Sequence, residues 1–218
     1  MNNGVLQALL PGVTGVLFGA GTRYLAAHLR RGAVLPVGSV EIPTGLLAAA
    51  AGLLVWPHPT VWLCWWITAF GVVLAAIDLR HHRIPDAISY PVMVGTAGLC
   101  LLLAPQLTPG GSGTVLLRAL IAAVVVGLLF ALPAVFAPGA MGWGDVKLAV
   151  SLGATLGAVS WDAVLSALLI TFVSAGLIAI LGLASRRLAA RSAVAFGPFL
   201  VTGAFVAVLL AGAVEVAR

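Results

Sequence analysis

The chain has 218 residues, of which 62% are hydrophobic and only 8% are charged, whereas soluble domains carry roughly 25% charged residues. A water-soluble globule of this size could not bury so much apolar surface, but a bilayer accepts helices that satisfy their own backbone hydrogen bonds. The net charge of +5 would suggest nucleic acid as a partner of a soluble protein. In a membrane protein, basic residues collect in cytoplasmic loops instead, so we expect a lipid-embedded protein and no nucleic-acid partner.

Apolar runs separated by proline, glycine or charged residues predict an all-α integral membrane bundle of about eight transmembrane helices. With boundary errors of a few residues, the runs are 5–27, 42–56, 60–77, 87–104, 114–137, 146–159, 163–183 and 194–214. The first run lacks a preceding basic segment and exceeds the length of a signal-peptide core, which predicts a retained helix. Length and composition leave no room for a second soluble domain, so we expect one membrane domain over residues 1–218.

The basic residues are distributed unevenly between the two sides of this bundle. Nine of the eleven follow the first, third, fifth and seventh runs: Arg23, Arg30, Arg31, Arg80, Arg83, Lys147, Arg186, Arg187 and Arg191. Only Arg118 and Arg218 lie on the other side. The positive-inside rule then places these four loops in the cytoplasm and both termini outside a plasma membrane.

Two of the six acidic residues lie where an apolar run meets one of these four loops. Asp78 ends the third run and Asp145 opens the sixth, so the topology places both on the same face of the membrane. Carboxylates at membrane depth are costly and usually functional. When two lie close together they repel, and the pair can share one proton. A shared proton is what aspartic proteolysis needs, because one carboxylate activates water while the other polarises the scissile carbonyl.

Structural roles are open for each of these acids. Asp145 could cap the helix that it opens, and Asp78 could pair with Arg80 or Arg83 at the interface. Asp86 follows Ile84-Pro85 at the start of the fourth run, where capping is the favoured interpretation. Glycines on both sides of Trp143, at 142 and 144, favour catalysis by Asp145, because they allow a substrate backbone to approach closely.

The sequence resembles the type IV prepilin peptidases, membrane aspartic peptidases of the GxGD class. The resemblance rests on IDLRHHRIPD at 77–86, GAMGWGDVKL at 139–148 and FGPFL at 196–200, with a fainter match over 15–31 and VEIP at 40–43. It implies catalytic roles for Asp78 and Asp145. The motif residues that could position the substrate are Gly142, Gly144, Lys147, Arg80, Pro85 and Asp86.

The resemblance also implies an activity and a substrate class. Members cleave short, basic leader peptides from prepilin or pseudopilin precursors at the cytoplasmic face, typically after a glycine. Many bacterial members carry a cytoplasmic insert with two C-x-x-C pairs, associated with zinc, after the first helix. Here that loop is only about residues 30–41 and has no cysteine. We therefore expect no zinc, and no N-methylation of the product with S-adenosylmethionine, the second activity known in the family.

The remaining candidate ligands do not predict a metal or cofactor site. Cys64 and Cys100 lie inside apolar runs without a C-x-x-C pair, so we expect small buried side chains. His81 and His82 are adjacent, and adjacent histidines seldom face one ion. Lys147 could raise the ionised fraction of Asp145, bind an acidic substrate residue or follow the positive-inside rule. The resemblance leaves the role of Glu41 open, and Pro198 is expected to begin the last helix.

Two other functions fit parts of the pattern. A small-solute transporter would also place acids and broken helices in a bundle, but usually near the bilayer midplane, whereas Asp78 and Asp145 are expected at one face. A GxGD peptidase of the presenilin type would carry Pro-Ala-Leu in a late helix, where this chain has Phe-Gly-Pro-Phe at 196–199.

Overall fold

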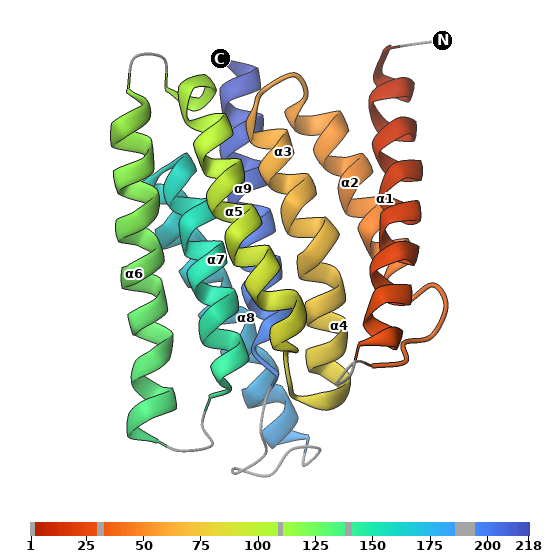
Figure 1. Ribbon diagram of the computed structural model, residues 1–218, viewed down its shortest axis with the longest axis vertical. Helices are drawn as coiled ribbons and strands as arrows, with labels where there is room; N and C mark the ends of the chain where they lie inside the picture. Colours follow the sequence, from red (N-terminus) through yellow and green to blue (C-terminus); the bar gives the residue numbers. More distant parts are fainter. Residues whose placement is uncertain (1–2, 30–32, 109–110, 138–140, 186–194) are drawn as a thin grey trace.

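The computed structural model describes residues 3–29, 33–108, 111–137, 141–185 and 195–218, and within these ranges it is a bundle of helices (Figure 1). The helices are α1 (Asn3–His28), α2 (Glu41–Val55), α3 (Thr60–Trp66), η1 (Ile67–Gly71), α4 (Val72–His81), α5 (Asp86–Leu107), α6 (Ser112–Phe136), α7 (Trp143–Val159), α8 (Trp161–Ala184) and α9 (Gly197–Ala217).

The helices agree with the predicted apolar runs within a few residues. One of the runs contains α3, η1 and α4, which follow one another without a break, and η1 is a π-helix inside this rod. Six of the helical segments, including Thr60–His81, are long and apolar enough to cross a membrane, whereas α2, with 15 residues, and α7, with 17, are shorter. The prediction of a helical, multi-pass membrane protein is confirmed at this level.

Successive rods run in opposite directions, so the connections alternate between the two ends of the bundle (Figure 1). The C-terminal ends of α1, α4, α6 and α8 lie at one end, together with the N-terminal ends of α5 and α7. The start of α1 and the end of α9 lie at the other. The arginines at 30, 31, 186, 187 and 191, for which the sequence predicts a cytoplasmic position, lie outside the described residues. Gly139 and Ala140 of the glycine-rich motif also lie outside them.

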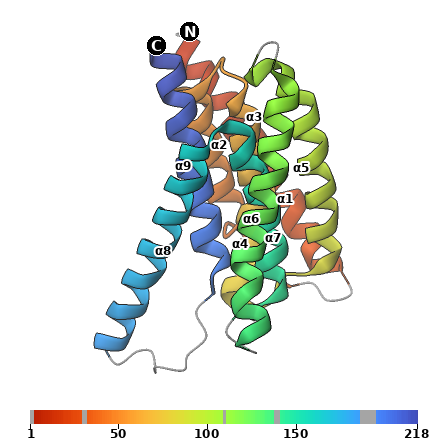
Figure 2. The same ribbon diagram turned by 90° about the vertical axis from the view of Figure 1, so that its left-hand side faces the viewer.

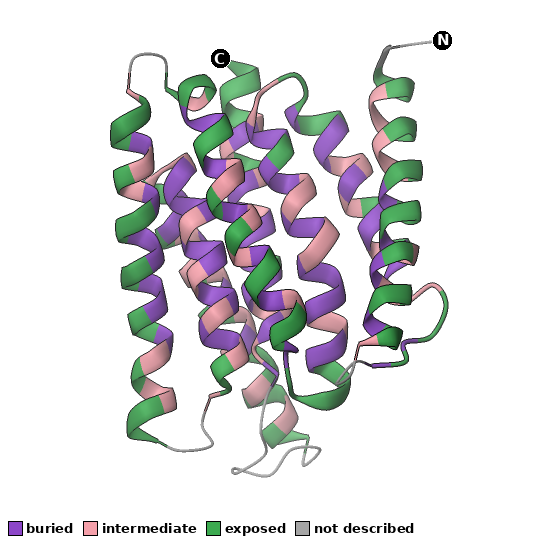
Figure 3. Ribbon diagram, viewed as in Figure 1, coloured by how far each residue is buried: buried purple, intermediate pink, exposed green. Residues whose placement is uncertain are grey.

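Small residues allow the helices to approach closely. In α7, a Cβ added at Gly157 would come within 2.5 Å of the Ala122 Cβ on α6, and small residues are the usual contact between membrane helices. Figure 3 shows buried positions facing the middle of the bundle and exposed positions on the outer faces of α1 and α6. Many exposed positions are large and apolar, such as Leu17 and Leu128, which suits a lipid environment.

Two partly buried polar contacts hold neighbouring helices together. Arg23 on α1 pairs with Glu41 on α2, whose carboxylate also accepts the backbone N–H groups of Gly38 and Val40. At the opposite end, Arg118 on α6 donates to the last carbonyl groups of α7, at residues 157–159. This satisfies acceptors that a helix end leaves free, and it gives Arg118 a structural role. Figure 2 shows α8 leaning away from the other helices towards its C-terminal end.

Candidate active site

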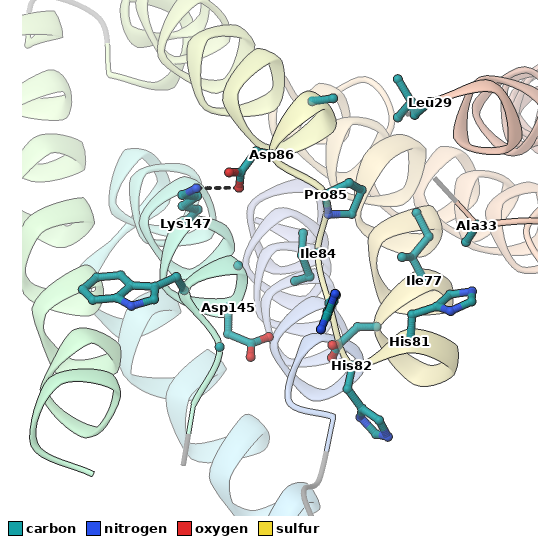
Figure 4. Close-up of a pocket in the computed structure, with 16 residues that line it drawn as sticks. Leu29, Ala33, Ile77, His81, His82, Ile84, Pro85, Asp86, Asp145 and Lys147 are labelled. Atoms are coloured by element: carbon teal, nitrogen blue, oxygen red, sulfur yellow. Dashed lines mark hydrogen bonds and ion pairs between the residues drawn. The ribbon is translucent and has the colours of Figure 1, made fainter. Parts of the chain in front are cut away.

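A cavity of about 780 Å³ opens where the ends of α1 and α4 meet the starts of α5 and α7. Both Asp78 and Asp145 line it, although 66 intervening residues separate them in the sequence. Figure 4 shows Asp145 on one side of this cavity, with Ile84 and Pro85 crossing between it and the end of α4, which carries Ile77. The structure therefore brings the two predicted aspartates into one pocket.

Asp78 lies in the last turns of α4, and only 3% of its surface is exposed. Its Oδ2 accepts a hydrogen bond of 2.9 Å from the backbone N–H of Gly197, the first residue of α9. A free N–H at a helix start is a natural donor to a carboxylate. This contact, rather than a pairing with Arg80 or Arg83, anchors Asp78 in the described part of the chain.

Gly197 lies in the FGPFL block on which the family resemblance rests, but the sequence assigned it no contact with Asp78. A Cβ at this position would lie 2.8 Å from Asp78 Oδ2 and 3.2 Å from its Cβ, so only glycine leaves room for the carboxylate. Pro198 follows in the first turn of α9, and its predicted role in starting this helix is confirmed. The FGPFL block thus begins a helix and also presents a backbone donor to Asp78.

Asp145 is the third residue of α7, and 8% of its surface is exposed. Within the described ranges, its buried Oδ1 has no hydrogen-bond partner. The N-cap residue of α7 is Gly142, and Asp145 lies three residues further on, so Asp145 is not the N-cap residue of this helix. A buried carboxylate oxygen without a partner is costly. This cost is typical of a group that has a functional role.

The two glycines of the motif have separate steric roles. A Cβ on Gly144 would come within 2.6 Å of the Ile84 Cβ and 3.2 Å of the Ile84 backbone N. Gly144 therefore lets the start of α7 lie directly against the segment that joins α4 to α5. A Cβ on Gly142 would lie 3.2 Å from Asp145 Oδ2, so this glycine keeps the space beside the carboxylate open.

Asp86 does not cap α5, which corrects the interpretation made from the sequence. Pro85 is the N-cap residue, and Asp86 is the first residue of the helix. Its carboxylate instead accepts a 2.5 Å hydrogen bond from Lys147 Nζ on α7 (Figure 4). The same ammonium lies 4.5 Å from the ring centroid of Tyr90, within cation–π range. This cluster joins the starts of α5 and α7 at the rim of the pocket.

The other predicted site residues lie at or beyond the rim. Pro85 is buried and lines the pocket, as do the exposed His81, His82 and Arg83, whereas Arg80 is exposed and does not line it. No group of three or more His, Cys, Asp or Glu side chains that could hold a metal ion occurs among the described residues. Cys64 and Cys100 are buried and unpaired, as predicted.

Comparison with known proteins identifies the family. Residues 65–182 match the model of the type IV leader peptidase family, a range that includes both aspartates. The chain is 34% identical over 179 residues to a protein of Dickeya chrysanthemi, covering 78% of this chain and 58% of that protein. It is 28% identical over 178 residues to a protein of Burkholderia pseudomallei (strain 1026b), covering 77% of this chain and 54% of the relative.

Both relatives are named prepilin leader peptidase/N-methyltransferase. The chain spans less than two thirds of the length of either. No solved structure matches it significantly. Because the family model covers more than half of the chain and includes both aspartates of the pocket, the chain belongs to the type IV leader peptidase family.

Proposed function

We propose that this chain is a membrane aspartic endopeptidase that removes short basic leader peptides from prepilin-like or pseudopilin-like precursors. One observation carries the proposal: Asp78 and Asp145 line a single pocket at one end of the bundle. The family and the names of the relatives support the substrate class. The whole of residues 1–218 would then act as one membrane domain.

The proposed mechanism uses the two carboxylates as a pair that holds one proton. The ionised member takes a proton from a water molecule, and the water oxygen attacks the carbonyl carbon of the scissile peptide bond. The protonated member gives its proton to the carbonyl oxygen, so charge does not build up in the buried site. When the tetrahedral intermediate collapses, one of its hydroxyl groups returns a proton to this second carboxylate as the C=O bond re-forms. The C–N bond breaks, and the leaving nitrogen takes the proton held by the first carboxyl group, which restores the pair with one proton. The Oδ1 of Asp145, which has no partner within the described part of the chain, would hydrogen-bond to the water or the carbonyl.

The surrounding motif would position the substrate chain. Gly142 leaves space beside Asp145, and Gly144 holds α7 close to the Ile84-Pro85 segment, so an extended peptide could lie along this narrow wall. The ion pair between Lys147 and Asp86 would keep the starts of α5 and α7, which border this peptide path, in fixed positions relative to each other. Arg80 is exposed and does not line the pocket, so it would contact a part of the precursor that extends outside the pocket.

The topology of the proposed enzyme is a testable expectation. We propose eight transmembrane helices in the cell membrane, with both termini outside and the aspartate pocket facing the cytoplasm. The nine-to-two distribution of basic residues supports this orientation. Reporter fusions within 78–86 and within 185–192 should both report a cytoplasmic position. An outside signal from either segment would contradict the proposed orientation of the site.

Co-expression with candidate prepilins tests the function directly. We expect this chain, as the sole processing enzyme, to yield a precursor shortened at a single site, with the new N-terminus identified by sequencing. We also expect that N-terminus to be unmethylated, because the 30–41 segment is too short to form a pocket for S-adenosylmethionine. Mass spectrometry of the same product shows whether a methyl group has been added.

The two outcomes of this experiment are independent. An uncleaved precursor in cells with correctly inserted enzyme would contradict the peptidase proposal. A cleaved product that gains a methyl group from the purified protein would leave the peptidase proposal intact and overturn the expectation about methylation.

A further inference from the structure

A second cavity, of about 410 Å³, opens between α1, α2, the α3–η1 part of the third rod and α5. We call it the lateral groove. Among the residues that the structure describes, no charged side chain lines it, and its largest side chains are aromatic: Phe18, Trp62, Trp65, Trp66 and Phe70. Its threonine hydroxyls are already used, since those of Thr14, Thr44 and Thr68 each donate to a backbone carbonyl of their own helix or rod. The groove therefore offers an apolar surface.

The lateral groove and the catalytic pocket share two of their walls. On the continuous rod formed by α3, η1 and α4, Phe70 lines the groove and Ile77, next to Asp78, lines the pocket. These two residues are two helical turns apart, a rise of about 10 Å. Phe18 on α1 lines the groove, and Leu29, the residue after the end of α1, lines the pocket; a helical rise over these 11 positions is about 16 Å. Both cavities thus include residues of the rod that carries Asp78 and residues of α1 or of the segment just after it.

The π-helix η1 lies at this groove. Thr68, Ala69 and Phe70 of η1 all line it. Short π segments within helices are rare and often occur at functional sites. The π segment is thus a second feature, besides the cavity, that marks this part of the rod carrying Asp78.

We propose that the lateral groove binds the apolar segment of a membrane-anchored substrate, where that segment leaves the scissile peptide and enters the bilayer. This inference rests on the proposed function. An extended chain advances about 3.3 Å per residue, so roughly three to five residues span the 10 to 16 Å that separate lining residues of the pocket from those of the groove. Inside a bilayer such a segment gains from close packing rather than from leaving water, and flat aromatic walls and small residues provide that packing.

Filling the groove tests the proposal, with a matched control on the same helix. Thr14→Trp on α1 and Ala69→Trp on η1 place a large ring in the groove. Val13→Trp adds the same ring at an exposed neighbouring position that does not line the groove. Each variant is assayed on a membrane-anchored precursor and on a short soluble peptide that ends before the apolar segment.

We expect the ratio of anchored-precursor cleavage to peptide cleavage to fall about tenfold in both groove variants, because binding away from the scissile bond supports cleavage of the anchored substrate alone. Val13→Trp should keep the wild-type ratio. An unchanged ratio in Thr14→Trp and Ala69→Trp would overturn the groove proposal. Failure of the wild-type protein to cleave either substrate would instead contradict the proposed function.

Photocrosslinking gives a second, binding-based result that does not need peptide cleavage. A photoreactive phenylalanine analogue replaces Thr14 in an Asp145→Asn background and, in a parallel sample, replaces Val13. We expect an adduct with the apolar segment of the anchored precursor from position 14 and much less from position 13. Adducts with lipid alone from position 14, or equal precursor adducts from both positions, would overturn the proposal.

Discussion

Asp78→Asn and Asp145→Asn are each expected to lower prepilin cleavage by about three orders of magnitude or more, to the background of the assay. The amide has nearly the shape of the carboxylate, but it can neither take a proton from water nor supply an acidic proton. Because both carboxylates line one pocket and would act as one unit, the double variant should be no slower than either single variant. The measurement is the fraction of processed precursor over time at equal enzyme levels.

Membrane insertion and protein level are the controls, and both should stay near wild type. Asp86→Asn is a matched variant in the same pocket. It weakens the exposed ion pair with Lys147, and pairs of this kind are worth at most about 1 kcal/mol, so we expect only a small loss of activity. Substantial processing by well-inserted Asp78→Asn or Asp145→Asn protein would contradict the aspartic mechanism.

Gly197→Ala is expected to reduce cleavage by about 100-fold, the effect of displacing a catalytic group by about 1 Å. The added methyl group would lie 2.8 Å from Asp78 Oδ2. Either the carboxylate or the start of α9 must then move, and the hydrogen bond from the Gly197 N–H to Asp78 would be lost or lengthened. The loss should appear mainly in kcat, because the substitution disturbs Asp78 rather than the outer parts of the substrate site.

Gly176→Ala is the matched control. Gly176 lies in α8, and a Cβ there would meet no heavy atom within 4 Å. Alanine favours a helix over glycine by about 1 kcal/mol, so this variant should insert and cleave as the wild type does. Gly197→Ala protein with wild-type kcat would show that the contact with α9 does not hold Asp78 in its working position.

The positions of the helices could be predicted from the sequence because their signals are local. Apolar runs are interrupted by proline, glycine and charged residues at 56–59, 78–86 and 105–113, and each interruption coincides with a helix end in the structure. The π-helix η1 was missed. It differs from an α-helix only in which backbone groups pair, and residues 67–71 carry no special composition.

The two aspartates could be selected because acids are rare in this chain and costly beside apolar helices. The groups that contact these two aspartates could not be predicted in the same way. The Gly197 amide donates to Asp78 from 119 residues away, and a backbone donor has no side-chain signature. Asp86 was misread for a related reason: an aspartate at a helix start can cap it, but here Lys147, 61 residues later, binds the carboxylate instead.

The sequence alone therefore determined the lipid-embedded helical class, the order of the apolar runs, the family resemblance and the choice of Asp78 and Asp145, since each depends on residue type and local spacing. Only the tertiary structure decided that both carboxylates line one pocket, that Asp145 Oδ1 has no partner among the described residues and that α9 donates to Asp78. These features depend on how helices distant in sequence pack side by side. That packing arises from many small, shape-dependent contacts, of which the glycines at 144 and 197 are two, and no local pattern encodes them.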